Sequence, residues 1–183
     1  PWSFTDVTGN YNDASGKVHD MITQAAAVVS VSGYTGTYDG NAHGASGTAT
    51  GVGGVDLSSD LNLGSTFTDV PGGTAHWTFS NPNYADQSGD VAIVINKADP
   101  TISVTAYNVA FDGNAHTASG SATGVKAEVL TGLDLSGTTH TAAGDYPNDP
   151  WSFTDVTGNY NDASGKVHDI IGQASAIVSV SGY

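Results

Sequence analysis

The feature that most constrains this chain is a long internal repeat. Residues 1–20 read PWSFTDVTGNYNDASGKVHD, and the same twenty letters return at residues 150–169. The match continues at a constant offset of 149 residues as far as Tyr34 and Tyr183, with differences only at positions 21/170, 23/172, 26/175 and 28/177. Such a repeat predicts a linear array of small structural units rather than one large hydrophobic core.

A second and weaker repeat lies inside the first. YDGNAHGASGTATGV at residues 38–52 is echoed by FDGNAHTASGSATGV at residues 111–125. HWTF at 76–79 aligns with PWSF at 150–153, and NYADQSGDV at 83–91 aligns with NYNDASGKV at 159–167. The 149-residue unit therefore contains two alternating modules, each about 75 residues long, which we name module A and module B.

The repeat divides the chain into four parts. Residues 1–24 are the C-terminal part of a B-type module, residues 25–99 are a complete module A, and residues 100–174 are a complete module B. Residues 175–183 are the first strand of a further A-type module. We expect the sequence to be an excerpt of a longer periodic chain, because both of its ends fall inside modules. Exchange of the unpaired end strands between neighbouring subunits is the alternative.

Charge and composition exclude several classes of function. The chain has 18 acidic residues against 4 Lys and Arg, a formal net charge of −14, and no cysteine. Nucleic acid and anionic membranes are disfavoured as partners, since phosphate groups need Lys and Arg. No apolar stretch approaches the roughly 18–20 residues that span a bilayer, so no membrane insertion is expected. The 38% of hydrophobic residues alternate with polar ones, which is typical of a globular β protein rather than a disordered one.

Alternation of apolar and polar residues predicts β-strands in both modules. AVVSVSGY (27–34) and AIVSVSGY (176–183) alternate in this way, and TISVTAYNVAF (101–111) is their counterpart in module B. Asp-Gly pairs indicate tight turns at 39–40 and 112–113. Further strands are expected at 43–51, 61–70, 76–81 and 90–98. About six strands per module and no helical period predict an all-β fold of tandem small Ig-like β-sandwich modules, with β-grasp-like modules as the alternative.

Each module contributes one Trp with a Phe two positions later, which places two large aromatic rings on one face of a strand. Burying such rings is among the largest gains available to a small domain, so we interpret them as core residues. The predicted core aromatics are Trp2, Phe4, Trp77, Phe79, Trp151 and Phe153. A module of this size is marginally stable alone, and contacts with its neighbours in the array should add stability.

Comparing the two modules tests candidate sites, since a site that serves every module should recur in both. Lysines do not recur, and the alignment of Lys97 with Gln173 argues against a repeated Lys–Asn isopeptide bond. Among the histidines only His43 and His116 recur, and a zinc site needs three or four convergent ligands. No GxSxG or other nucleophile context is present, so the chain is not expected to be an enzyme.

Acidic and amide side chains in the turns do recur. Oxygen-rich loops with Asp and Asn at short spacings can hold Ca²⁺, whereas the same residues also form turns through side-chain-to-backbone hydrogen bonds. Both interpretations are open at this point. The candidate calcium ligands are Asp13, Asn10, Asp86, Asn83, Asp162, Asn159, Asp39 and Asp112.

Carbohydrate recognition would require exposed aromatic side chains. Tyr34, Tyr38, Tyr107 and Tyr146 are the candidates, although a Tyr beside a β-turn more often packs against it.

Motifs in both modules resemble the MBG/YDG group of bacterial surface repeats. The resemblance is carried by TYDGNAH (37–43), VAFDGNAH (109–116), SGTATGV, SGSATGV and the NY…SG…V…I strand endings, and it covers essentially the whole chain. It implies an Ig-like or β-grasp-like extracellular module used as a spacer, stalk or adhesive unit, without catalytic residues. Module B departs from the pattern at Asp169, where module A has Ile93, which puts the register of its last strand in question.

Repeats and resemblance together favour a structural role at a bacterial cell surface. We expect tandem modules that form an extracellular fibre, stalk or matrix filament whose partners are neighbouring modules or chains. The alternative is an adhesin whose modules recognise a glycan or a partner surface.

Overall fold

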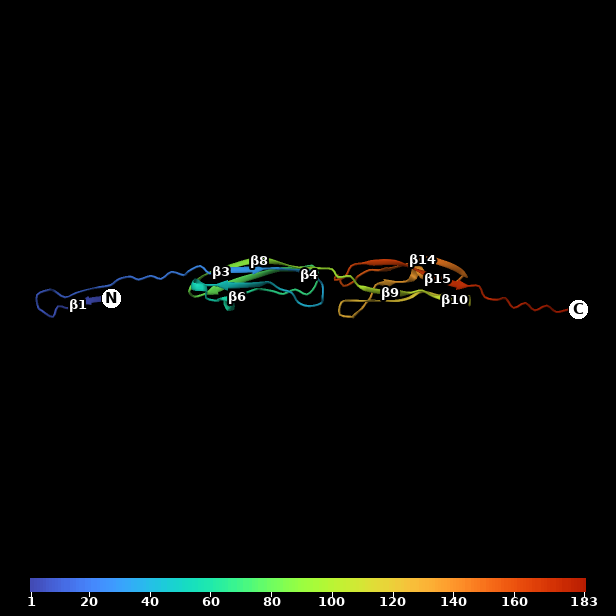
Figure 1. Cartoon of the computed structure of the whole chain (residues 1–183), viewed down its shortest axis with the longest axis horizontal. Coiled ribbons are helices and arrows are strands. Elements are labelled where there is room, and N and C mark those ends of the chain that lie inside the picture. Colours follow the sequence, from blue (N-terminus) through green and yellow to red (C-terminus); the bar gives the residue numbers. More distant parts are fainter.

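The computed structural model describes all 183 residues, and the protein is all-β. Figure 1 shows an elongated molecule in which modules A and B lie end to end, with an N-terminal hairpin and an extended C-terminal segment at opposite ends. The only helical elements are three short 3₁₀ turns, and none of them could cross a lipid bilayer. No α-helix covers a sheet, so the sandwich architecture is the one observed.

Module A is built from two sheets. Its strands are β3 (Val28–Ser32), β4 (Tyr34–Thr37), β5 (Ser46–Thr50), β6 (Leu61–Asn62), β7 (Gly72–Asn81) and β8 (Tyr84–Asn96), with 3₁₀ turns η1 (Val52–Gly54) and η2 (Ser58–Asp60). β3 and β5 form one antiparallel sheet. The other sheet has the order β4-β8-β7-β6, in which β4 runs parallel to β8 and the other pairs are antiparallel.

Module B repeats this plan. Its elements are β9 (Thr101–Thr105), β10 (Asn108–Ala110), β11 (Ser119–Thr123), β12 (Val129–Leu130), β13 (Leu133–Asp134), η3 (Ser136–Thr138), β14 (Gly144–Phe153) and β15 (Ala163–Gly172). One sheet has the order β12-β11-β9, and the other has the order β10-β15-β14-β13 with β10 parallel to β15. The N-terminal hairpin pairs β1 (Trp2–Phe4) with β2 (Ala14–Gly16), as the equivalent residues do in β14 and β15.

The first strand of each module belongs to both sheets. In module A the chain passes from β3 in one sheet to β4 in the other through Gly33. A Cβ at Gly33 would lie 2.0 Å from the carbonyl oxygen of Ala92, so only glycine fits at this crossing. The predicted Asp-Gly turns follow, with φ of +70° at Gly40 and +83° at Gly113.

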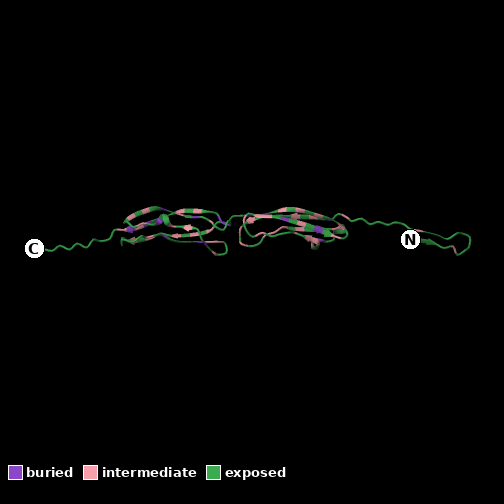
Figure 2. Ribbon diagram, turned by 180° about the vertical axis from the view of Figure 1, so that it is seen from behind, coloured by how far each residue is buried: buried purple, intermediate pink, exposed green.

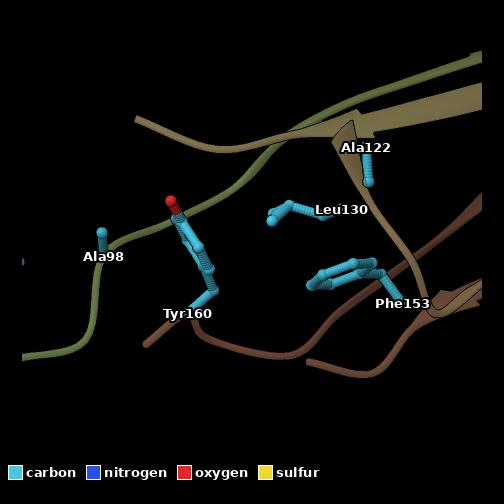
Figure 3. Packing of buried hydrophobic residues seen from close by; sticks show 5 residues of the cluster. All are labelled: Ala98, Ala122, Leu130, Phe153 and Tyr160. Atoms are coloured by element: carbon cyan, nitrogen blue, oxygen red, sulfur yellow. The ribbon is translucent and has the colours of Figure 1, made fainter. Parts of the chain in front are cut away.

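Each module encloses a small core between its two sheets. Figure 3 shows that of module B, where Phe153 and Tyr160 pack with Ala98, Ala122 and Leu130. The core of module A contains Ala27, Ala49, Leu57 and Phe79. Burial is confined to these interiors, as Figure 2 shows, and both ends of the chain are exposed.

The six predicted core aromatics are buried to three different extents. Phe79 and Phe153 are fully buried, as predicted. Trp77 and Trp151 are half-buried on the same strand faces, each covering a cross-strand glycine in β8 or β15. Trp2 and Phe4 are about half exposed, so their assignment to a core is wrong in this structure. The reason is that β1 and β2 have no second sheet packed against them.

Two predicted strands are shorter or absent. The expected strand at 61–70 is interrupted, because Gly64 has a φ of +78° and turns the chain. Leu61 and Asn62 pair with β7, and beyond the turn Phe67 forms an isolated antiparallel bridge with His43. Residues 176–183 are extended but pair with no other strand. The register of β15 shifts next to Asp169. Asp169 pairs with Tyr146 as Ile93 pairs with Gly73, but the next pair is Asp149 with Val167, so β14 carries a bulge that β7 lacks at the aligned place.

Candidate functional site

The link between modules A and B is itself a piece of β-structure. Ala98, two residues after the end of β8, forms a parallel bridge with Tyr160 in the loop between β14 and β15. Its amide donates to the carbonyl oxygen of Asn159 at 3.0 Å, and its carbonyl accepts from the amide of Asn161 at 2.9 Å. Ala98 is 3% exposed and belongs to the core of module B. The end of one module is therefore built into the next.

Asn159 joins module B to the loop before β7 of module A. Its Oδ1 accepts from the amide of Val70 at 2.9 Å, and its Nδ2 donates to Oδ1 of Asp69 at 3.0 Å. Asn159 is 7% exposed, so both hydrogen bonds are shielded from water. A third bond joins the Nδ2 of Asn161 to Oδ1 of Asp99 at 2.7 Å.

Tyr160 lies at the centre of this junction and is 1% exposed. Its ring meets that of Tyr38 from module A edge to face, with centroids 5.5 Å apart. Its hydroxyl accepts from the amide of Val125 at 3.0 Å and donates to Glu128. Burial and this bond to Glu128 raise the pKa of Tyr160 to about 12. The Nζ of Lys126 also donates across the junction, to the carbonyl oxygen of Gly40.

The entry to module A has the same main-chain geometry. Ala25 forms a parallel bridge with Tyr84, donates to the carbonyl of Asn83 at 3.0 Å and accepts from the amide of Ala85 at 2.8 Å. The hydroxyl of Tyr84 accepts from the amide of Val52 at 3.0 Å. Asn83, however, is exposed here and Tyr84 only half-buried, because no preceding module covers them. The Asn-Tyr pair is thus the repeated linking element of the array.

Most of the candidate calcium ligands form turns. Asp39 and Asp112 accept from the amides of Asn41 and Asn114 at 2.8 Å, and each also contacts the His four residues later. These bonds lower the pKa of Asp39 and bring that of Asp112 down to about 2. The carboxylates are therefore held ionised by local donors.

The remaining candidates lie in the hairpin loops. Asp13 and Asp162 accept from the amides of Asp6 and Asp155 at 2.8 and 2.9 Å. The side chain of Asn10 donates to Thr8 at 3.3 Å. Asp86 and Asn83 are exposed, and Asn159 serves the junction. The structure brings together no group of three or more acidic or histidine side chains that could hold a metal ion. This arrangement does not support calcium binding at these turns, because their oxygens already serve main-chain amides.

Module B also contains a buried polar group that sequence comparison did not single out as a site. Asp169 is fully buried, its Oδ1 accepts from the amide of Tyr107 at 2.9 Å, and its Oδ2 has no hydrogen-bond partner. Burial and the neighbouring Asp149 raise the pKa of Asp169. The Oδ2 of Asp149 accepts from the Nε2 of His140 at 2.9 Å. The signal was present in the sequence, because His140, Asp149 and Asp169 align with the apolar residues Phe67, Ala75 and Ile93 of module A.

The four candidate tyrosines are engaged in packing. Tyr34 stacks on His43 with ring centroids 4.0 Å apart, and Tyr146 stacks on His140 at 3.6 Å. Tyr38 packs at the junction, and the hydroxyl of Tyr107 donates to the carbonyl of Thr138 at 3.1 Å.

Comparison with known proteins found no family model that matches this chain and no curated protein that is similar to it. The class of protein is therefore defined by the geometry of the sandwich modules and their junction alone. It is an array of β-modules joined end to end.

Proposed function

We propose that this chain is a structural repeat unit of an extracellular bacterial fibre, stalk or matrix filament, of the kind formed by the MBG/YDG group. The observation that carries the proposal is the A–B junction. Ala98 leaves module A and enters the core of module B, so the two modules share a buried interface rather than a flexible linker. Such a connection transmits force and direction along the array.

The shape and charge of the molecule support the same proposal. The modules lie in one line (Figure 1). The linking Asn-Tyr pair occurs three times in the sequence, at Asn10–Tyr11, Asn83–Tyr84 and Asn159–Tyr160. The net charge of −14 keeps a long array soluble and extended.

Electron microscopy of native assemblies and of the purified chain tests the proposal. A structural unit should give straight rods in which modules A and B hold a fixed angle, and the native assembly should show a module-scale axial repeat. A glycan array run on the same protein covers the adhesin alternative. Modules joined by a freely bending hinge, together with specific binding to a glycan, would overturn the structural role.

A further inference from the structure

One loop of module B faces module A, and its side chains differ from those of the equivalent loop in module A. Residues 124–128 and residues 51–55 close with the same main-chain bond, from the amide of the first residue to the carbonyl of the fifth, at 2.9 and 2.8 Å. In both loops the amide of the second residue donates to the hydroxyl of the linking tyrosine at 3.0 Å. The loops are therefore equivalent, and three positions differ, Gly53/Lys126, Gly54/Ala127 and Val55/Glu128.

Lys126 reaches across the junction to module A. Its Nζ donates to the carbonyl oxygen of Gly40, and a Cβ at Gly40 would lie 2.5 Å from the Cε of Lys126. The side chain therefore lies directly over the Asp-Gly turn at 39–40. The whole chain has 4 Lys and Arg against 18 acidic residues. One of these few cations is thus placed beside an acidic turn, whereas the aligned Gly53 would bring none.

Glu128 holds the tyrosine at the centre of the junction. One oxygen of its carboxylate accepts from the hydroxyl of Tyr160, and the other accepts from the amide of Lys126 at 2.8 Å. The ring of Tyr160 is thereby fixed where it meets Tyr38 of module A. In module A the side chain of the aligned Val55 offers no acceptor, so Tyr84 lacks this support. Glu128 is therefore a positioning residue that only module B supplies.

The matching difference on module A is Asp69. Its Oδ1 accepts from the Nδ2 of Asn159 at 3.0 Å, and Asn159 is 7% exposed. The isolated bridge two residues earlier is present in both modules, so Asp69 is equivalent to Ala142. An alanine in place of Asp69 would leave a shielded amide donor without an acceptor, which costs free energy. The acceptor for Asn159 is therefore specific to module A.

We propose that the C-terminal face of module A is specific for a B-type module. This face consists of Tyr38, Gly40, Asp69, Val70 and Ala98. It recognises Lys126 and Glu128 in addition to the Asn-Tyr pair that both module types share. A second A-type module in this place would present glycine and valine instead. The inference deepens the proposed function and rests on it, because the junction is the contact that makes the array rigid.

The contacts of this face are of two kinds. Asn159 and Tyr160 are shielded from water and supply most of the stability, but the Asn-Tyr pair occurs in both module types and does not discriminate between them. Lys126 is exposed, so its bond adds little affinity, while its charge favours an acidic partner surface. Specificity is a difference between two affinities, and it therefore depends on Lys126, Glu128 and Asp69.

A loop exchange in the full chain tests the proposal. The variant K126G/A127G/E128V gives module B the loop residues of module A, which builds the same loop from them, so the fold should be kept. Hydrogen exchange of the amides of Val70 and Ala98, both bonded to Asn159, should become several-fold faster. Small-angle X-ray scattering should show a wider distribution of angles between the modules. Junction amides and angles that match those of wild type would overturn the proposal.

V55E is the matched control, since it makes the reverse change at the aligned position of module A. That loop contacts Tyr84 at the start of β8, whereas the junction follows the end of β8. Junction amides and angles should therefore stay as in wild type, and circular dichroism should be the same for all variants. If V55E loosens the junction as much as the loop exchange does, the effect is not specific and the proposal fails.

Asp69 is tested by a pair of variants. D69A removes the acceptor, whereas D69N removes the charge and keeps an oxygen that can accept from Asn159. Exchange of the Val70 amide should become several-fold faster in D69A and change little in D69N, because Asn159 loses one of its two anchors only in D69A. Equal effects of the two variants, or none, would exclude Asp69 from the recognition.

The proposed function is judged apart from these variants, by the rod shape of the wild-type chain. Straight wild-type rods whose junction is indifferent to the loop exchange would remove the specificity for module B and leave the structural role. Wild-type modules that bend freely would remove both.

Discussion

At the scale of single residues, the two modules differ most in the side chains at three aligned positions of the sandwich, which are apolar in module A and polar in module B. Module A has Phe67, Ala75 and Ile93 there, and Ala75 and Ile93 are almost completely buried. In module B the aligned positions hold His140, Asp149 and Asp169. Replacing apolar side chains by a buried carboxyl with an unpartnered oxygen costs free energy of folding unless the group is neutralised.

This difference predicts that Asp169→Asn stabilises the protein at neutral pH. The folded-state pKa of Asp169 is raised above its ordinary value by burial, so the stability of module B is greatest below that ordinary value and is lost as pH rises through the folded pKa. Asn keeps the acceptor for Tyr107 and is neutral throughout. We expect a gain of about 1–3 kcal/mol at pH 7, which shrinks toward pH 4. Denaturant unfolding at a series of pH values measures it.

The groups around Asp169 provide the control for that experiment. Asp149, His140 and Tyr107 face it, and the variant leaves all three unchanged. Ile93→Val, at the aligned position of module A, should shift stability by the same amount at every pH. A stability gain for Asp169→Asn that is constant from pH 4 to pH 8 would contradict the assignment.

The turn aspartates lead to a prediction about metal removal. Asp112 accepts from the amide and side chain of Asn114 and from His116, and these donors bring its pKa down to about 2. Asp112→Ala should lower the melting temperature by a few degrees, because the turn loses its acceptor. A chelator should leave the melting temperature of the wild type unchanged. A fall in the wild-type value with chelator, reversed by Ca²⁺, would restore the calcium interpretation.

At the scale of elements, the junction is where neighbouring units are coupled. Asn159→Ala removes two shielded hydrogen bonds and leaves the amide of Val70 without its acceptor. We expect a loss of about 1–2 kcal/mol in the free energy of unfolding and a wider distribution of angles between the modules. Unfolding curves and small-angle X-ray scattering measure the two effects.

The aligned variant Asn83→Ala is the matched control for the junction. Asn83 is exposed, and its side chain makes no hydrogen bond in this chain. Its replacement should change stability little and leave the shape unaltered. Equal effects of the two variants would mean that the junction bonds contribute nothing specific.

The sequence predicted those elements whose pattern is local. Alternation predicted β3 and β9, and the strands expected at 76–81 and 90–98 cover only parts of β7 and β8. The Asp-Gly pairs predicted turns that the positive φ of Gly40 and Gly113 confirms. Alternation cannot say whether a strand has a partner, so the segment at 176–183 was predicted as a strand although nothing pairs with it here. Trp2 and Phe4 were assigned to a core for the same reason, since burial depends on a sheet supplied from elsewhere in the chain.

The functional residues were harder to predict because their roles involve two modules. Recurrence identified Asn159 as important, but its residue type suggested a calcium ligand, whereas its partners are Asp69 and Val70 of the other module. Tyr160 was not singled out at all, although it recurs with Asn159 in every module. A recurrent pair in a hairpin loop could equally serve the turn or a neighbour, and only the fold distinguishes the two.

At the scale of the whole molecule, the excess of acidic residues opposes the folded state. The chain has a formal net charge of −14, and like charges on the two modules repel one another. The cores of the modules depend on apolar contacts, which salt screens little. Ionic strength should therefore act on stability through the repulsion.

We accordingly expect the free energy of unfolding to rise with salt. The Debye length falls from about 30 Å at 0.01 M to about 8 Å at 0.15 M ionic strength, which removes most of the long-range repulsion between the modules. Denaturant unfolding at the two ionic strengths measures the change. A free energy of unfolding that falls with salt would instead mean that complementary charges hold the modules together.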